Sequence, residues 1–115
     1  MKSKLLNKEE FSLKLSKQII TGKELLIFSV KTIEDLDIFK KNSKIWSEFN
    51  LELLKQSFSE SNNEYKNEYE KCVLIIAALG NFSLHEKSMD IKDKIKKRLN
   101  CLESIQNRLE LIPNI

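Results

Sequence analysis

Residues 32–58, TIEDLDIFKKNSKIWSEFNLELLKQSF, hold the pattern that decides the fold. Thr32 followed by Asp35 resembles a helix capping box, with Asp in the place of the usual Glu. Beyond it, large apolar residues mark one helical seam: Leu36, Phe39, Trp46 and Leu53. Small or polar residues occupy the alternate seam positions: Ser43, Asn50 and Ser57. The spacing predicts a helix that ends near Phe58 and is roughly 40 Å long.

The polar positions on this seam suggest association between helices. A polar residue at a seam position costs stability but can fix the register or oligomeric state of packed helices. We therefore expect helix-mediated association, either with a protein partner or between copies of the chain. Aromatic residues near this seam are either exposed anchors or, as is more usual at helical spacing, core. The candidate partner-binding residues are Trp46, Phe49, Asn50, Tyr65 and Tyr69.

Periodic apolar residues also predict a helix before this stretch and one after it. The earlier helix spans about residues 8–28, and Thr21-Gly22 within it predicts a bend or a close helix contact. The later helix begins near Tyr65, becomes apolar nearly all round by Leu79, and stops at Gly80-Asn81. A helix of that kind is expected to be central in a bundle or to carry an interface.

The last helix is predicted to begin at one of two places. Ser83 and Glu86 form a second possible capping box, and the alternative is an ordered loop with a helix that starts nearer Met89. Pro113 closes the helix. Residues 59–63 read as a plain connector. Short connections favour antiparallel neighbours, so we expect a single all-α domain over residues 1–115, an up-down bundle of about four helices with the second and fourth long.

Charge is unevenly distributed along the chain, although the net value is only +3. Residues 1–31 carry seven Lys against three Glu, and residues 87–98 carry six basic residues against two Asp. Such alternation is usually a set of solvated helix faces, and the sharper alternative is a phosphate-binding patch. No aromatic residue lies between positions 87 and 98 for base stacking. The candidate phosphate-binding residues are Lys92, Lys94, Lys96, Lys97 and Arg98.

The residues needed for most catalytic and metal sites are missing. His85 is the only histidine, and zinc or di-iron sites need more ligands than the chain supplies. Both arginines follow His85, so the Arg-then-His order of small helical ribonucleases is absent. Two glycines cannot build a phosphate-binding loop. Cys72 lies in the most apolar segment, where thiols are usually inert. We expect no catalytic residue, no metal, no cofactor and no enzymatic activity.

The expected location is the cytoplasm. Cys72 and Cys101 lie far apart in the sequence and suggest reduced thiols rather than a disulfide framework. The N-terminus lacks the apolar core of a signal peptide. The longest apolar run, residues 72–79, is far shorter than the ~20 residues that a membrane span needs, so no membrane partner is expected.

Several short runs occur in a familiar order. They are Gly22-Lys23-Glu24-Leu25-Leu26, Trp46, Asn50, Glu52-Leu53-Leu54, Phe58, Glu64-Tyr65 or Glu68-Tyr69, Leu102-Glu103-Ser104-Ile105, and Arg108 through Pro113. This order resembles the helical region upstream of TIR-like nucleotide-binding domains in bacterial proteins, many of them linked to antiphage defence. The most specific piece is the C-terminal Leu-Glu-Ser-Ile to Leu-Ile-Pro run.

That resemblance implies a recognition or oligomerisation module, either standing alone or cut from a longer protein. In the family the helical region leads into an effector domain with the catalytic residues, and here the sequence ends two residues after Pro113, so no catalytic residue carries over. We expect a non-enzymatic interaction protein of bacterial defence or phage counter-defence. The alternatives are a nucleic-acid-binding regulator that uses residues 92–98 and the basic N-terminus, and a small phage-encoded inhibitor of a host nuclease.

Overall fold

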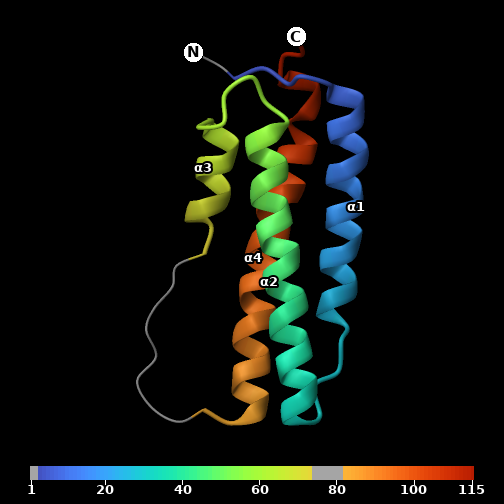
Figure 1. Ribbon diagram of the computed structural model, residues 1–115, viewed down its shortest axis with the longest axis vertical. Coiled ribbons are helices and arrows are strands. Elements are labelled where there is room, and N and C mark those ends of the chain that lie inside the picture. The colour runs from blue at the N-terminus through green and yellow to red at the C-terminus, as the bar shows by residue number, and fades with distance from the viewer. Residues whose placement is uncertain (1–2, 74–81) are drawn as a thin grey trace.

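Four helices in up-down-up-down order make up the part of the chain that the computed structural model describes, residues 3–73 and 82–115. The helices are α1 (Lys8–Leu26), α2 (Ile33–Gln56), α3 (Glu64–Lys71) and α4 (Leu84–Asn107), followed by a short 3-10 helix, η1 (Leu109–Leu111). In Figure 1, α1 and α3 descend while α2 and α4 rise. The prediction of an all-α bundle with long second and fourth helices is confirmed, since α2 and α4 have 24 residues each.

Side-chain caps set where the two long helices begin. The Thr32 hydroxyl accepts a hydrogen bond from the Asp35 amide at 3.1 Å, and the Asp35 carboxylate accepts one from the Thr32 amide at 3.2 Å. Ser83 and Glu86 make the same reciprocal pair at 3.1 and 3.4 Å. Each pair satisfies two amides that a helix start leaves without an intrahelical partner. The last helix therefore starts at its capping box, and the later start near Met89 is wrong.

The three long helices enclose the core. Buried apolar side chains line their facing sides: Phe11, Leu15 and Ile19 on α1, Phe39, Trp46, Leu53 and Leu54 on α2, and Ile95, Leu99, Leu102 and Ile105 on α4. The seam expected on α2 is confirmed, because its small and polar members Ser43 and Asn50 are buried beside the apolar ones. None of the described helices is both long enough and apolar enough to cross a membrane.

Gly22 marks a close helix contact and not a bend. α1 is continuous through Thr21-Gly22. A Cβ atom added at Gly22 would lie 2.5 Å from a methyl carbon of Leu99 and 2.5 Å from the ring of Trp46. Glycine therefore lets α1 approach α2 and α4 at a distance that no larger residue permits without a shift.

The third helix is shorter than predicted and is not central. α3 ends at Lys71, and Cys72 and Val73 are no longer helical. Its eight residues, EYKNEYEK, bury only Tyr65 and Tyr69, so it has too narrow an apolar face to be surrounded by other helices. It lies alongside the upper parts of α2 and α4 (Figure 1). The expected apolar half and the Gly80-Asn81 stop fall on residues 74–81, outside the described residues.

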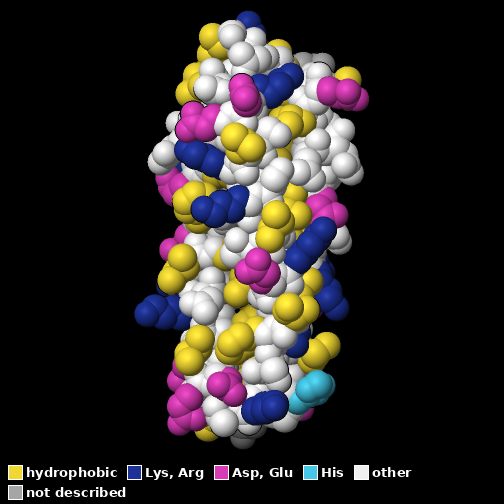
Figure 2. Space-filling model, turned by 90° about the vertical axis from the view of Figure 1, so that its right-hand side faces the viewer, with side chains coloured by type: hydrophobic (Ala, Val, Ile, Leu, Met, Phe, Trp, Pro, Cys, Tyr) yellow, Lys and Arg dark blue, Asp and Glu magenta, His cyan; other side chains and the backbone are white. Residues whose placement is uncertain are grey.

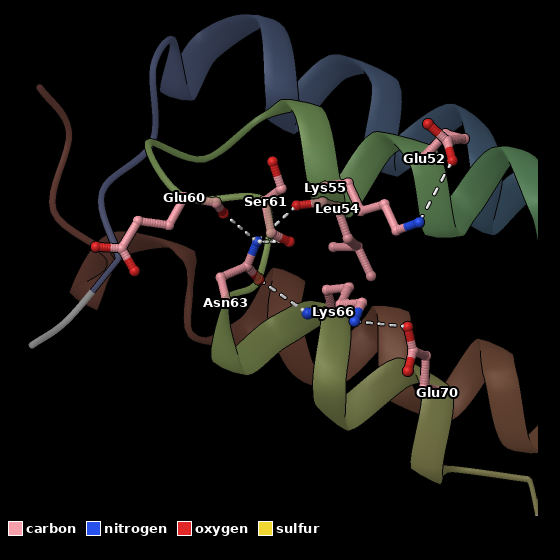
Figure 3. Close-up of polar contacts among 8 residues, drawn as sticks. All are labelled: Glu52, Leu54, Lys55, Glu60, Ser61, Asn63, Lys66 and Glu70. Atoms are coloured by element: carbon pink, nitrogen blue, oxygen red, sulfur yellow. Dashed lines mark hydrogen bonds and ion pairs between the residues drawn. The ribbon is translucent and has the colours of Figure 1, made fainter.

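The connector between α2 and α3 is a specific structure, contrary to the prediction of a plain link. The Asn63 side chain is 2% exposed and donates to the carbonyl oxygens of Leu54 at 3.0 Å and Glu60 at 2.8 Å. Its own side-chain oxygen accepts from the amide of Lys66 at 2.9 Å and so caps α3 (Figure 3). One buried amide thus ties the last turn of α2 to the first turn of α3.

The segment before α1 closes the upper end of the bundle, which the sequence did not predict. Leu5 is fully buried and lies between two other segments. Its amide donates to the Pro113 carbonyl at 2.8 Å, and its carbonyl accepts from the Ile115 amide at 2.9 Å. The Leu6 amide donates to the Ser57 carbonyl at 2.9 Å. These backbone pairs join both ends of the described chain to the end of α2, as Figure 1 shows at its top.

Candidate functional site

Four of the five predicted partner-binding residues lie inside the protein. Trp46, Asn50, Tyr65 and Tyr69 are all buried, and only Phe49, at 50% exposed, reaches the surface. The expectation of an exposed anchor surface built from these five is therefore corrected, because four of them pack between the chain's own helices. Residues at a helical seam fill the core when the same chain supplies the facing helices.

The polar residues on the α2 seam form a network with α1 and α3. The Gln18 side-chain amide donates to Asn50 at 2.9 Å, and the Asn50 amide donates to the Tyr69 hydroxyl at 3.1 Å. The Tyr69 hydroxyl also shares a 3.1 Å hydrogen bond with the Ser47 hydroxyl, and the Trp46 indole donates to the Gln18 carbonyl at 2.8 Å. Burial raises the pKa of the Tyr69 hydroxyl, so it stays a neutral donor and acceptor at neutral pH.

This network changes how Asn50 is interpreted. Asn50 is fully buried, and its polar atoms are paired with groups of the same chain. A buried polar network of this kind favours one helix register over others, since any slip leaves polar atoms unpaired. Asn50 therefore helps to fix the arrangement of α1, α2 and α3 within one chain, and it is not available to a second chain.

Exposed apolar side chains instead follow the outside of α1 and α2. We call six of them the outer face, and each is between 49% and 83% exposed: Leu13, Ile20, Ile27, Ile38, Ile45 and Phe49. Figure 2 views the molecule from the α1 side and shows hydrophobic side chains along its whole length, separated by charged ones. The sequence holds the signal for this face, because Leu13, Ile20 and Ile27 recur every seven residues, opposite the buried residues of α1.

Phe49 lies between two hollows in the α1–α2 groove. The upper hollow is also lined by Leu6 and Leu53, and the lower one by Leu25 and Ile45. Both are open to solvent and have apolar residues in their walls. Phe49 is thus the one predicted anchor that the structure leaves accessible, and it stands at the middle of the groove.

The predicted phosphate-binding residues do not share one surface. Lys94 and Arg98 line a groove between α2 and α4, together with Lys40 and Lys44 of α2, which the sequence analysis did not single out. Lys92, Lys96 and Lys97 are not in that groove, since residues 92–98 cover nearly two helical turns and point in different directions. Lys94 and Lys97 also form ion pairs on their own helix, with Asp90 at 3.0 Å and with Asp93 at 3.2 Å.

Two cysteines that are distant in the sequence come together in space. Cys72 follows α3 and Cys101 lies on α4, and each thiol shifts the pKa of the other. The hydrogen bond from Cys101 and the charge of Arg98 lower the pKa of the Cys72 thiol to about 7. The same contact raises the pKa of the Cys101 thiol, since Cys101 is the donor of the pair. The protonated Cys72 thiol donates to the Tyr69 carbonyl at 2.9 Å.

No metal centre is built from the described residues. Within residues 3–73 and 82–115, no three His, Cys, Asp or Glu side chains converge as metal ligands. His85 is exposed in the first turn of α4. Comparison with family models, curated proteins and solved structures found no match for the chain. The outer face and the two grooves are surfaces that the described residues leave open for binding.

Proposed function

We propose that this protein is a non-enzymatic, helix-mediated interaction module whose working surface is the outer face of α1 and α2. The observation that carries the proposal is the exposure of six large apolar side chains along two adjacent helices. Single exposed apolar residues are ordinary, but rows of them on neighbouring elements mark interaction surfaces in soluble proteins. When a partner covers exposed Leu, Ile and Phe side chains, apolar surface is removed from water, and this favours association.

The spacing of these residues fits a helical partner. Leu13 and Ile20 are seven residues apart on α1, Ile27 follows seven residues later just after the end of that helix, and Ile38 and Ile45 are seven residues apart on α2. A repeat of seven keeps apolar side chains on one seam of a helix, where they pack between the side chains of a facing helix. The groove beside Phe49 and Ile45 offers a hollow for an apolar side chain of the partner.

A second copy of the chain is the partner that we propose. A surface that contains apolar helix rows can pair with itself about a twofold axis, which is the commonest symmetry of soluble oligomers. Charge does not oppose this pairing, because α1 has four Lys against three Glu and α2 has four Lys against five acidic residues. The charged residues around the face therefore include both signs.

Light scattering on a concentration series tests self-association. We expect the molar mass of the unmodified protein to rise toward twice its 13.5 kDa chain mass. Ile20→Glu and Ile45→Glu each place a charge in the outer face and are expected to keep the protein at the mass of one chain, because burying an unpaired charge is costly. Both positions are exposed, so neither variant disturbs the core.

Met89→Glu is the matched control. Met89 is also an exposed apolar residue, but it lies on α4, away from the outer face. This variant is expected to associate like the unmodified protein. A constant mass of 13.5 kDa at every concentration contradicts self-association, and so does equal loss of association in all three variants.

The biological setting is a further part of this proposal. The resemblance to helical regions upstream of TIR-like domains supports a role in bacterial defence or phage counter-defence, within the cytoplasm. Inspection of the reading frame and its genomic neighbours tests this part. A neighbouring effector domain, toxin or other defence gene is expected, and a neighbourhood of unrelated metabolic genes argues against the setting without affecting the interaction surface.

A further inference from the structure

A basic groove runs between α2 and α4, on a different side of the bundle from the outer face. It has a volume of about 340 Å³, and its charged walls are Lys40 and Lys44 from α2 and Lys94 and Arg98 from α4. Ser47 also lines the groove, and its hydroxyl shares a hydrogen bond with Tyr69 of α3. α2 and α4 rise in the same direction in Figure 1, so the two pairs of cations run in parallel.

The four cations form two like-charged pairs, one on each helix. Lys40 and Lys44 are four residues apart on one helix, and so are Lys94 and Arg98 on the other. Like charges at this spacing destabilise a helix. The same spacing also occurs for Lys92 and Lys96 outside the groove, so what distinguishes the four groove cations is that two helices bring them together. An anion bound between the two pairs would remove the repulsion.

Most of this charge is not neutralised by the protein itself. Within the described part of the chain, Lys40, Lys44 and Arg98 have no ion-pair partner, while Lys94 pairs with Asp90 at 3.0 Å. Glu48 is the one carboxylate that lines the groove. Counting Glu48 and Asp90 against the four cations leaves two positive charges, so a ligand with at least two negative charges fits better than a single carboxylate.

The uncharged groups of the groove favour phosphate over a nucleobase. The hydroxyls of Ser43 and Ser47 lie in its wall and are of the kind that donates to phosphate oxygens. Arg98 brings a planar guanidinium that binds two oxygens of one phosphate at once. Among the described residues that line the groove, Ile91 is the only large apolar one, and none carries an aromatic ring on which a base can stack.

We propose that the α2–α4 groove binds the phosphoryl or pyrophosphoryl group of a small ligand through Lys40, Lys44, Lys94 and Arg98. The hydroxyls of Ser43 and Ser47 complete the site. This site is independent of the proposed self-association, since none of its residues belongs to the outer face. The ligand is recognised by its phosphates, and the concave shape selects a compact group over an extended strand.

Calorimetric titration of the full chain with inorganic pyrophosphate tests the site. Saturable binding to one site per chain is expected. The double variant Lys40→Gln/Lys44→Gln removes two exposed charges without touching the core and is expected to weaken binding at least about tenfold. Arg98→Lys keeps the net charge but loses the planar donor pair, and it is expected to weaken binding as well.

The matched control is Lys96→Gln/Lys97→Gln, which removes the same charge from α4 outside the groove. It is expected to change the affinity by less than about twofold, because exposed charges away from the site are screened by salt. Absence of saturable binding at millimolar pyrophosphate overturns the proposal, and so does equal weakening in the groove and control variants.

Two further titrations identify the source of the phosphate. A nucleoside diphosphate that binds as pyrophosphate does supports recognition of the phosphates alone, and tighter binding supports a nucleotide as the natural ligand. A titration with a single-stranded oligonucleotide tests whether the protein instead binds nucleic acid through a general basic surface. If the oligonucleotide binds and all variants, the control included, weaken its binding equally, the protein has a general basic surface and the groove is not a specific site.

Discussion

Asn63 is the residue on which the joint between α2 and α3 depends. We predict that Asn63→Ala lowers the free energy of unfolding by about 2–3 kcal/mol. The loss combines an N-cap, worth about 1 kcal/mol, with the unpaired carbonyls of Leu54 and Glu60. Urea unfolding measures it. Asn62→Ala is the control, because the neighbouring amide is exposed and its loss should cost less than about 0.5 kcal/mol. Equal effects in the two variants contradict the account.

Replacing Gly22 by alanine has two opposing effects on the stability of the protein. Alanine in place of glycine gains about 1 kcal/mol of helix propensity, while overpacking costs about 1–3 kcal/mol. We predict that the cost of overpacking is larger and that Gly22→Ala destabilises the protein. The new Cβ atom would lie 2.5 Å from the Trp46 ring, which is held by its hydrogen bond to the Gln18 carbonyl. Lys17→Ala, at an exposed position of α1, serves as the reference in the same unfolding assay. A Gly22→Ala protein more stable than its parent would refute this.

Cys72 is predicted to react as a thiolate near neutral pH. The rate of its alkylation by iodoacetamide should follow a pKa of about 7, because Cys101 donates to the thiolate and Arg98 is nearby. The thiolate is therefore populated above pH 7 and lost below it. Mass spectrometry at a series of pH values measures the profile, with Cys101 labelled more slowly because its pKa is raised. Arg98→Gln should move the midpoint upward, and a midpoint at or above about 8.5 in the parent protein contradicts the prediction.

At the scale of elements, the segment before α1 behaves as part of the core. We predict that Leu5→Ala costs about 2–4 kcal/mol of unfolding free energy, since Leu5 is fully buried. Leu6→Ala is the matched control, because Leu6 is 53% exposed and should cost less than about 0.5 kcal/mol. The comparison uses the same denaturant series. Similar small losses in both variants would mean that the upper end of the bundle is not closed as described.

The elements that local rules specify were predicted, and those that distant contacts specify were not. Thr32 and Ser83 predict the starts of two helices, because each N-cap side chain forms a hydrogen bond with the residue three positions later. Leu5 gives no such signal, because its partners are Pro113, Ile115 and Phe58, which a sequence pattern does not bring near. The start of α3 near Tyr65 was predicted, but its end at Lys71 was not, because no Gly or Pro marks that end in the sequence.

The candidate site was predicted least well, for a reason that belongs to the whole molecule. The seam pattern indicates that Trp46 faces the core, but the sequence does not reveal whether a partner or the chain's own helices cover it. The decision depends on α1, whose Gly22 admits the Trp46 ring and leaves Phe49 at the groove. The basic groove was not predicted for a similar reason, since Lys40 and Lys44 come near Lys94 and Arg98 only when α2 and α4 pack side by side.

The outer face of α1 and α2 is the central claim at the scale of the whole molecule. Isotope-filtered NMR on a mixture of labelled and unlabelled chains detects contacts between copies and assigns them to residues. The account predicts intermolecular contacts from the methyl groups of Leu13, Ile20 and Ile45, growing with protein concentration. Absence of any intermolecular contact at high concentration would contradict it, as would contacts confined to Met89, Leu111 and Ile115, which are exposed elsewhere.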